Sequence, residues 1–151
     1  MRENRLLKTL RAGHVATGLV IPILSPDVVE LCGHVGFDFA FIDCEHGPIG
    51  IQGCQDMVRA ADAVGITPIV RIPKDTVHEI NRYLDLGAQG VIVPHVNTAA
   101  DAKRAVAEAQ FSPRGHRGAA SSSRAAGFGL PQDADTYFRD VNKEILVLPL
   151  I

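Results

Sequence analysis

The sequence predicts an α/β protein, a parallel (β/α) barrel of the TIM type that is incomplete, with about five strands of the usual eight. Short, β-branched apolar runs recur along the chain, and helical patterns separate them. Continuous apolar runs, unlike alternating ones, indicate strands buried on both faces, as in parallel sheets. The first run is not followed by G-x-G-x-x-G. An open doubly wound sheet, the alternative fold, therefore lacks its dinucleotide-binding fingerprint.

The predicted strands are the five apolar runs, at residues 17–23, 37–43, 67–72, 90–95 and 145–151. The first four begin at intervals of roughly 20 to 30 residues, which leaves room for one crossover helix after each strand. Right-handed crossovers between such strands give a parallel sheet. The chain ends inside the last apolar run, at Ile151. We therefore expect either a truncated chain or an open sheet edge that pairs with another element.

Helical patterns occupy the segments between these strands, at residues 3–10, 26–32, 52–64, 76–86, 98–109 and 133–141. Ser25 is a suitable N-cap, and Pro26 suits the first helical position. Gly87 is placed to end the helix before it. Residues 111–131 are rich in Gly, Ser, Ala and Arg and predict a long loop, which is either a mobile connection or a binding or intersubunit segment.

Composition favours a single globular domain over residues 1–151, with 46% hydrophobic and 21% charged residues. A net charge of −2 gives no sign of a nucleic-acid or membrane partner. Cys32, Cys44 and Cys54 have no C-x-x-C spacing and predict free thiols in a reducing compartment. No apolar run approaches the roughly 18 residues of a membrane span or resembles a signal peptide, so we expect a cytoplasmic protein.

Reactive side chains concentrate after the second strand, where Asp43, Glu45 and His46 are followed by Gly-Pro. In parallel α/β folds, catalytic groups gather at the carboxyl ends of strands. A carboxylate beside an imidazole fixes its tautomer and favours general-base chemistry. Arg71, at the end of the third strand, either pairs with Asp43 or Glu45 or holds an anionic substrate. His95 ends the fourth strand, where it either lines the pocket or has no role.

The remaining candidates have weaker signals. His14, His34, His78 and His116 have no partner at ligand spacing and are expected to be ordinary histidines. The arginines of the long loop either bind an anion or form a solvated basic segment, which is the simpler expectation; they are Arg114, Arg117 and Arg124.

Four blocks of sequence, in order, resemble the HpcH/HpaI aldolase family. They are FDFAFIDCEHGP at 37–48, PIVRIP at 68–73, YLDLGAQGVIVP at 83–94 and PRGHRG at 113–118. The resemblance is to the N-terminal part of the family's 4-hydroxy-2-oxoheptanedioate and 2-dehydro-3-deoxyglucarate aldolases. It implies a barrel of the phosphoenolpyruvate/pyruvate type, assembled as a hexamer. It also implies class II cleavage of a 4-hydroxy-2-oxo acid to pyruvate and an aldehyde, as in the catabolism of aromatic compounds.

The resemblance also implies roles for individual residues. His46 would be the acid/base group, Asp43 would orient it, and Glu45 would support a metal-bound water and contact the substrate. Arg71 would hold the carboxylate and keto oxygens of pyruvate. Asp85 matches an aspartate that supports the site from a neighbouring subunit.

A divalent cation, Mg²⁺, Mn²⁺ or Co²⁺, is the cofactor that the resemblance implies. Its ligands would be a glutamate directly after the fifth strand and a later aspartate, and both would lie beyond Ile151. We therefore expect residues 1–151 alone to be inactive or severely impaired. Two other interpretations remain open: a related 2-oxo-acid lyase of the citrate-lyase type, and a non-catalytic half-barrel that serves as an interaction module.

Overall fold

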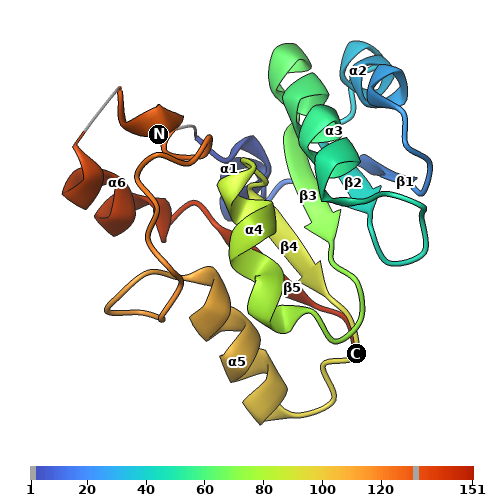
Figure 1. Cartoon of the computed structure of the whole chain (residues 1–151). Coiled ribbons are helices and arrows are strands. Elements are labelled where there is room, and N and C mark those ends of the chain that lie inside the picture. Colours follow the sequence, from blue (N-terminus) through green and yellow to red (C-terminus); the bar gives the residue numbers. More distant parts are fainter. Residues whose placement is uncertain (1–2, 131–132) are drawn as a thin grey trace.

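The computed structural model describes residues 3–130 and 133–151, and it contains one parallel five-stranded sheet (Figure 1). The strands lie in chain order, and each pairs with the next. Doubly wound sheets reverse their strand order at a switch point, and this one does not. The arrangement is therefore that of a barrel wall, as predicted, and each strand lies within its predicted run: β1 (Gly18–Ile21), β2 (Phe39–Asp43), β3 (Thr67–Arg71), β4 (Gly90–Val93) and β5 (Leu146–Pro149).

Helices occur in every segment where the sequence predicts one: α1 (Arg5–Arg11), α2 (Pro26–His34), α3 (Ile51–Val64), α4 (Ile80–Asp85), α5 (Ala99–Ala109) and α6 (Ala134–Val141). The Ser25 side chain caps α2, as predicted. The pattern at 76–86 is the exception, because it begins as a 3₁₀ turn, Val77–Glu79, before α4. There the Thr76 hydroxyl donates to the Pro73 carbonyl, which favours a tight turn over a regular first helical turn.

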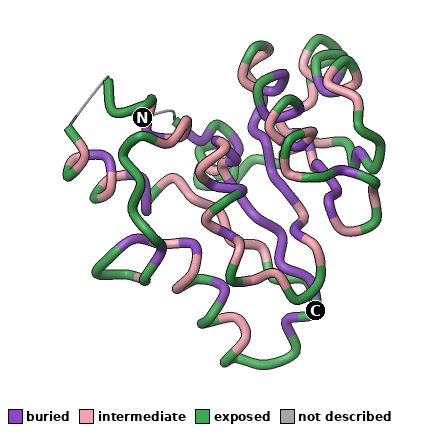
Figure 2. Tube along the Cα trace, viewed as in Figure 1, coloured by how far each residue is buried: buried purple, intermediate pink, exposed green. Residues whose placement is uncertain are grey.

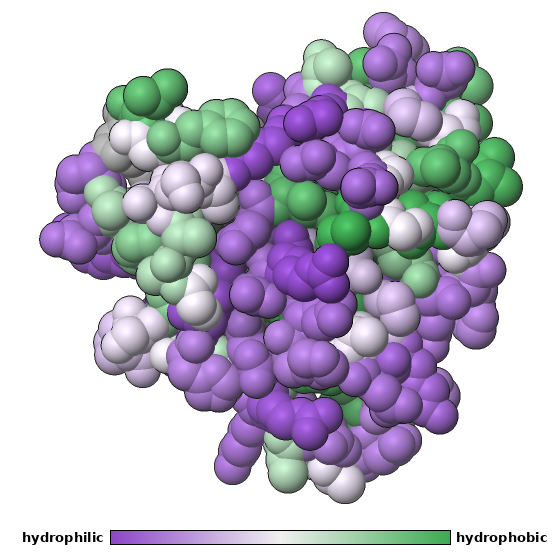
Figure 3. Space-filling model, viewed as in Figure 1, coloured by the Kyte–Doolittle hydropathy of each residue, from purple (hydrophilic) through white to green (hydrophobic). Residues whose placement is uncertain are grey.

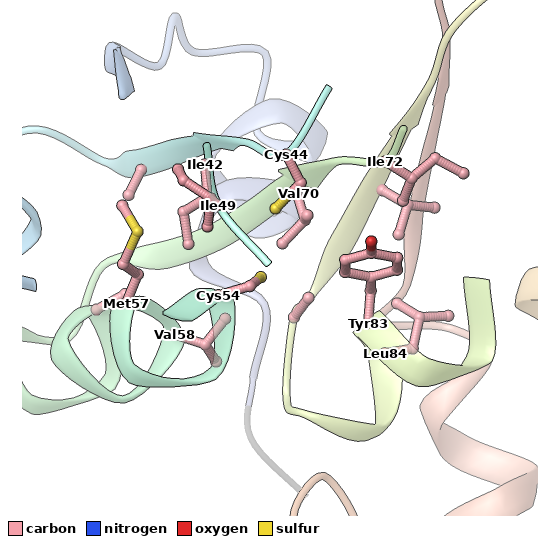
Figure 4. Close-up of a cluster of buried hydrophobic side chains, with 14 of the residues drawn as sticks. Ile42, Cys44, Ile49, Cys54, Met57, Val58, Val70, Ile72, Tyr83 and Leu84 are labelled. Carbon is pink, nitrogen blue, oxygen red and sulfur yellow. The ribbon is translucent and has the colours of Figure 1, made fainter. Parts of the chain in front are cut away.

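The two faces of the sheet bury different side chains. Helices α2 to α5 cover one face, and the largest apolar cluster lies beneath them (Figures 1 and 2). Ile42, Cys44 and Val70 belong to that cluster (Figure 4). The opposite, inner face carries Phe39, Phe41, Ile69 and Ile92, against which Leu6 of α1 packs. Because side chains alternate along a strand, Asp43 and Arg71 fall on the inner face, and they are direct partners in the register of β2 and β3.

Much of the long loop is exposed, including Arg114, but Arg117 and Arg124 pack against the protein, which corrects the simpler expectation for these two arginines. The Arg117 side chain is fully buried, lies 2.6 Å from the Asp85 carboxylate and covers the Phe111 ring. Arg124 forms an ion pair with Asp62 and donates to the Leu86 carbonyl. Residue 131, at the predicted end of this loop, lies outside the described residues.

The surface over α4 and α5 is mainly hydrophilic, and hydrophobic residues gather near α2 (Figure 3). The exposed apolar residues of that region include Ile23, Leu24, Leu31 and Val35. Within the described ranges, no helix combines the length and the apolar character that crossing a bilayer requires.

Candidate active site

The turn after β2 is fixed by Asp43. Its Oδ1 accepts hydrogen bonds from the main-chain N–H groups of Glu45 and His46, each at 3.1 Å. Gly47 follows, at a point where the turn touches the end of β1. A Cβ atom on Gly47 would collide with the Pro22 carbonyl oxygen and lie 2.5 Å from that of Asp43. The backbone approach therefore requires glycine, and it fixes the position of His46.

Asp43 and Arg71 form a double hydrogen bond across the β2–β3 register. Arg71 Nε donates to Asp43 Oδ1 at 2.9 Å, and Nη2 donates to Oδ2. Burial raises the pKa of Asp43, but the bonds from Arg71 and from the two N–H groups outweigh it, so its pKa lies below the usual value. The hydrogen bond to Asp43 raises the pKa of Arg71. The sequence left two roles open for Arg71, an ion pair with a carboxylate of the protein or the binding of an anionic substrate. The ion pair with Asp43 is present, and Arg71 Nη1 is left to donate to another acceptor.

Glu45 lies at the centre of the cluster, between three basic side chains. Its Oε2 is 3.4 Å from Arg71 Nε and 3.7 Å from His46 Nε2, and its Oε1 is 3.8 Å from His95 Nε2. The Glu45 side chain is only 9% exposed, whereas those of His46 and His95 are 71% and 58% exposed. A buried carboxylate therefore links Arg71 to two imidazoles that reach into solvent.

The predicted contact between Asp43 and the His46 imidazole takes another form. Asp43 holds the main chain of His46, and the carboxylate beside the imidazole is that of Glu45. Asp43 therefore positions the residue, while Glu45 lies where it can orient the ring. The sequence alone could not distinguish the two carboxylates, because both lie within three positions of His46.

The cluster has an unusual charge balance for a site that would accept an anion. Two carboxylates, Asp43 and Glu45, face one guanidinium, that of Arg71. With neutral imidazoles, the cluster carries a net negative charge. An anionic substrate thus needs further positive charge, from a protonated imidazole or from a cation.

A divalent cation has no ligand set among the described residues, since no group of three or more His, Cys, Asp or Glu is arranged to hold one. Asp85 lies apart from the cluster. It ends α4, only a few residues before β4 begins, and so belongs to the opposite edge of the sheet, where it pairs with Arg117.

Comparisons with known proteins show which family this sequence matches. Residues 16–151 match the profile of the HpcH/HpaI aldolase/citrate lyase family. The 4-hydroxy-2-oxovalerate aldolase of Novosphingobium aromaticivorans is 34% identical over 98% of this chain and 55% of its own length. The hydroxypyruvate/pyruvate aldolase of Sagittula stellata is 36% identical over 97% of this chain and 56% of its own length.

The fold agrees as well. The crystal structure of a family protein from Burkholderia cenocepacia J2315 superimposes with a TM-score of 0.87 at 33% identity, over 97% of this chain and 58% of that one. The chain thus spans a little over half the length of the relatives that it matches. Its sequence and its TIM-barrel-like fold make it a member of the HpcH/HpaI aldolase/citrate lyase family.

Proposed function

We propose that the protein is a class II pyruvate aldolase, which cleaves a 4-hydroxy-2-oxo acid to pyruvate and an aldehyde, and that residues 1–151 alone have impaired activity. The observation that supports this most is the meeting of Arg71 and His46 around Glu45, on the inner face at the carboxyl edge of the sheet. The Arg71 guanidinium suits the carboxylate of a 2-oxo acid, and the His46 imidazole suits proton transfer. The family relatives named as aldolases support the same chemistry.

The proposed reaction begins at the 4-hydroxyl group of the substrate. His46 removes its proton, the bond between C3 and C4 breaks, and the aldehyde leaves. The electron pair passes to the three-carbon fragment as a pyruvate enolate. The protonated His46 then returns the proton to C3, which gives pyruvate and regenerates the neutral imidazole. Arg71 holds the carboxylate through its free donors, while Asp43 keeps the guanidinium in place.

The net negative charge of the cluster favours a cation as the cofactor. The substrate anion and the developing enolate both add negative charge to a site that is already negative. On the family resemblance, we propose Mg²⁺, Mn²⁺ or Co²⁺ as the cofactor. The described residues do not by themselves offer it a ligand set, and no step above depends on it.

The test is pyruvate release, coupled to lactate dehydrogenase, with Mn²⁺ present, by a purified form that carries the complete barrel; residues 1–151 alone, measured beside it, should release little or no pyruvate. The decisive variant is Arg71→Lys, which keeps the charge but removes the bidentate geometry. We expect kcat/KM to fall by about a hundredfold or more. Arg59→Lys is the matched control, because Arg59 makes an exposed ion pair with Asp56 on α3. Full activity in Arg71→Lys would exclude the proposed role of this side chain.

Asp85 and the oligomer remain proposals on the resemblance. A homo-hexamer in which Asp85 supports a neighbouring site predicts that Asp85→Asn lowers activity. In this chain the substitution also removes the charge that faces buried Arg117. Light scattering and thermal unfolding should therefore be measured on the same variant, because an intact hexamer of normal stability with lower activity distinguishes the intersubunit role.

A further inference from the structure

His95 is the one imidazole of the cluster to which neither the resemblance nor the proposed reaction gives a role. It follows β4, the neighbour of the strand that carries Arg71. Its Nε2 lies 3.8 Å from Glu45 Oε1, while His46 Nε2 lies 3.7 Å from the other oxygen. The two imidazoles therefore approach one carboxylate from different strands, His46 from the β2 turn and His95 from the β4 turn.

The backbone around His95 holds its side chain in this place. Leu150 N–H donates to the Val93 carbonyl, and Val96 N–H donates to the Leu150 carbonyl. The β4 turn is thus tied to the end of β5 on both sides of His95. Within it, His95 has a φ of 55°, a region that few residues other than glycine adopt. Val93 and Val96 are buried, whereas the His95 side chain is 58% exposed.

We propose that His95 is a specificity-determining binding residue of the same site: its imidazole donates a hydrogen bond to an oxygen atom on the aldehyde half of the substrate. This inference rests on the proposed aldolase function. Arg71 takes the pyruvate half, and His46 takes the proton of the 4-hydroxyl. The substituent on C4 then lies near the groups of the cluster that have no part in these two steps, and His95 is a polar, solvent-exposed group among them. The substrate class that fits is an aldehyde with a hydroxyl or carboxylate oxygen next to its carbonyl.

Charge supports this assignment. The cluster is negative when its imidazoles are neutral, and Glu45 lies within ion-pair distance of His95. An imidazole offers one N–H donor when it is neutral and two when it is protonated. His95 would thus bring a hydrogen-bond donor to the site from the β4 turn, on the side of Glu45 that faces Oε1.

The test separates the two halves of the reaction in a purified form that carries the complete barrel, with Mn²⁺ present. Deuterium exchange of the pyruvate methyl protons, followed by NMR, needs Arg71 and His46 but no aldehyde. Aldol addition of pyruvate is then measured with glycolaldehyde and with propionaldehyde, which has a methyl group in place of the hydroxyl. The variant is His95→Asn, because asparagine adopts positive φ readily. His78→Asn is the control, because His78 is exposed on the 3₁₀ turn before α4.

We expect His95→Asn to lower kcat/KM for glycolaldehyde by roughly tenfold, as the loss of one hydrogen bond does. Propionaldehyde addition and methyl exchange should stay within twofold of the wild type, and His78→Asn should change none of the three. Equal losses in all three reactions would show that His95 has only a structural role. An unchanged ratio of kcat/KM between glycolaldehyde and propionaldehyde would show that His95 has no role in specificity. Either result overturns the inference. A wild-type protein that exchanges no methyl protons overturns the proposed function, and this inference with it.

Discussion

Asp43→Asn should destabilise the protein, because Asp43 is the most heavily bonded carboxylate of the site. Its side chain is 3% exposed and accepts two hydrogen bonds from Arg71 and two from main-chain N–H groups. The asparagine amide would turn an N–H group toward one of these donors. Breaking a buried ion pair costs about 3–5 kcal/mol. Since Arg71 keeps Glu45 as a partner at 3.4 Å, we expect the lower end, about 3 kcal/mol.

Urea unfolding followed by circular dichroism measures this loss, and in a thermal scan it corresponds to about 6–12 °C in Tm. Asp56→Asn is the control, because Asp56 pairs with Arg59 on the surface of α3 and should cost at most about 1 kcal/mol. If the two variants were equally stable, the buried pair would contribute no more than a surface pair, and the reasoning would be wrong.

The loss of stability in Asp43→Asn should depend on pH, and the sign of this dependence follows from the pKa of Asp43. The folded pKa of Asp43 lies below its ordinary value, so the contribution to stability is complete above the unfolded pKa of about 3.9. It is lost as the pH falls further, through the folded pKa. The stability difference between wild type and Asp43→Asn should therefore be constant near neutral pH and shrink below about pH 4. A difference that grows on acidification would contradict the assignment.

Three further predictions concern the turn, the thiols and the metal. Gly47→Ala should cost about 1–3 kcal/mol and reduce activity, because its Cβ meets backbone oxygens; Gly50→Ala, with nothing within 4 Å, should be nearly neutral in the same unfolding and activity assays. All three thiols are buried, and the pKa is raised in Cys32 by burial and in Cys54 by the Cys44 thiol and burial. A thiol reagent should thus label the native protein slowly and urea-unfolded protein fast; equal rates would contradict the burial. In the form that carries the complete barrel, EDTA should abolish pyruvate release and Mn²⁺ should restore it, whereas turnover that survives complete chelation would exclude the proposed metal dependence.

The strands and most of the helices of this fold could be predicted because their apolar patterns and capping residues suit the positions that they occupy in the fold. Strands buried on both faces must be continuously apolar, and the caps at Ser25 and Thr98 have side chains that bond the first turns of α2 and α5. The helix predicted from residue 76 shows where local pattern fails. Its periodicity is helical, but the turn after Pro73 redirects the first residues, and periodicity contains no information about such tertiary constraints.

The candidate site was predictable as a group but not in its contacts. The positions of Asp43, Glu45, His46 and Arg71 at strand ends follow from the apolar runs that precede them. Which carboxylate contacts which base depends on the turn geometry, which the residue order does not specify. The burial of Arg117 was missed for a similar reason. Its partner, Asp85, is more than thirty residues away in the chain, and a Gly- and Ser-rich composition suggests exposure.

The position of Cys44 between Asp43 and Glu45 has a consequence for engineering. Cys44 points into the helix-covered core, toward Cys54 of α3 (Figure 4), while the residues on either side of it face the opposite way. Mutational libraries that vary the exposed His95 can therefore explore new aldehyde acceptors without disturbing the core, whereas randomising Cys44 would mainly test foldability. In this short segment, neighbouring residues therefore serve different ends: Glu45 faces the candidate site, and Cys44 faces the core.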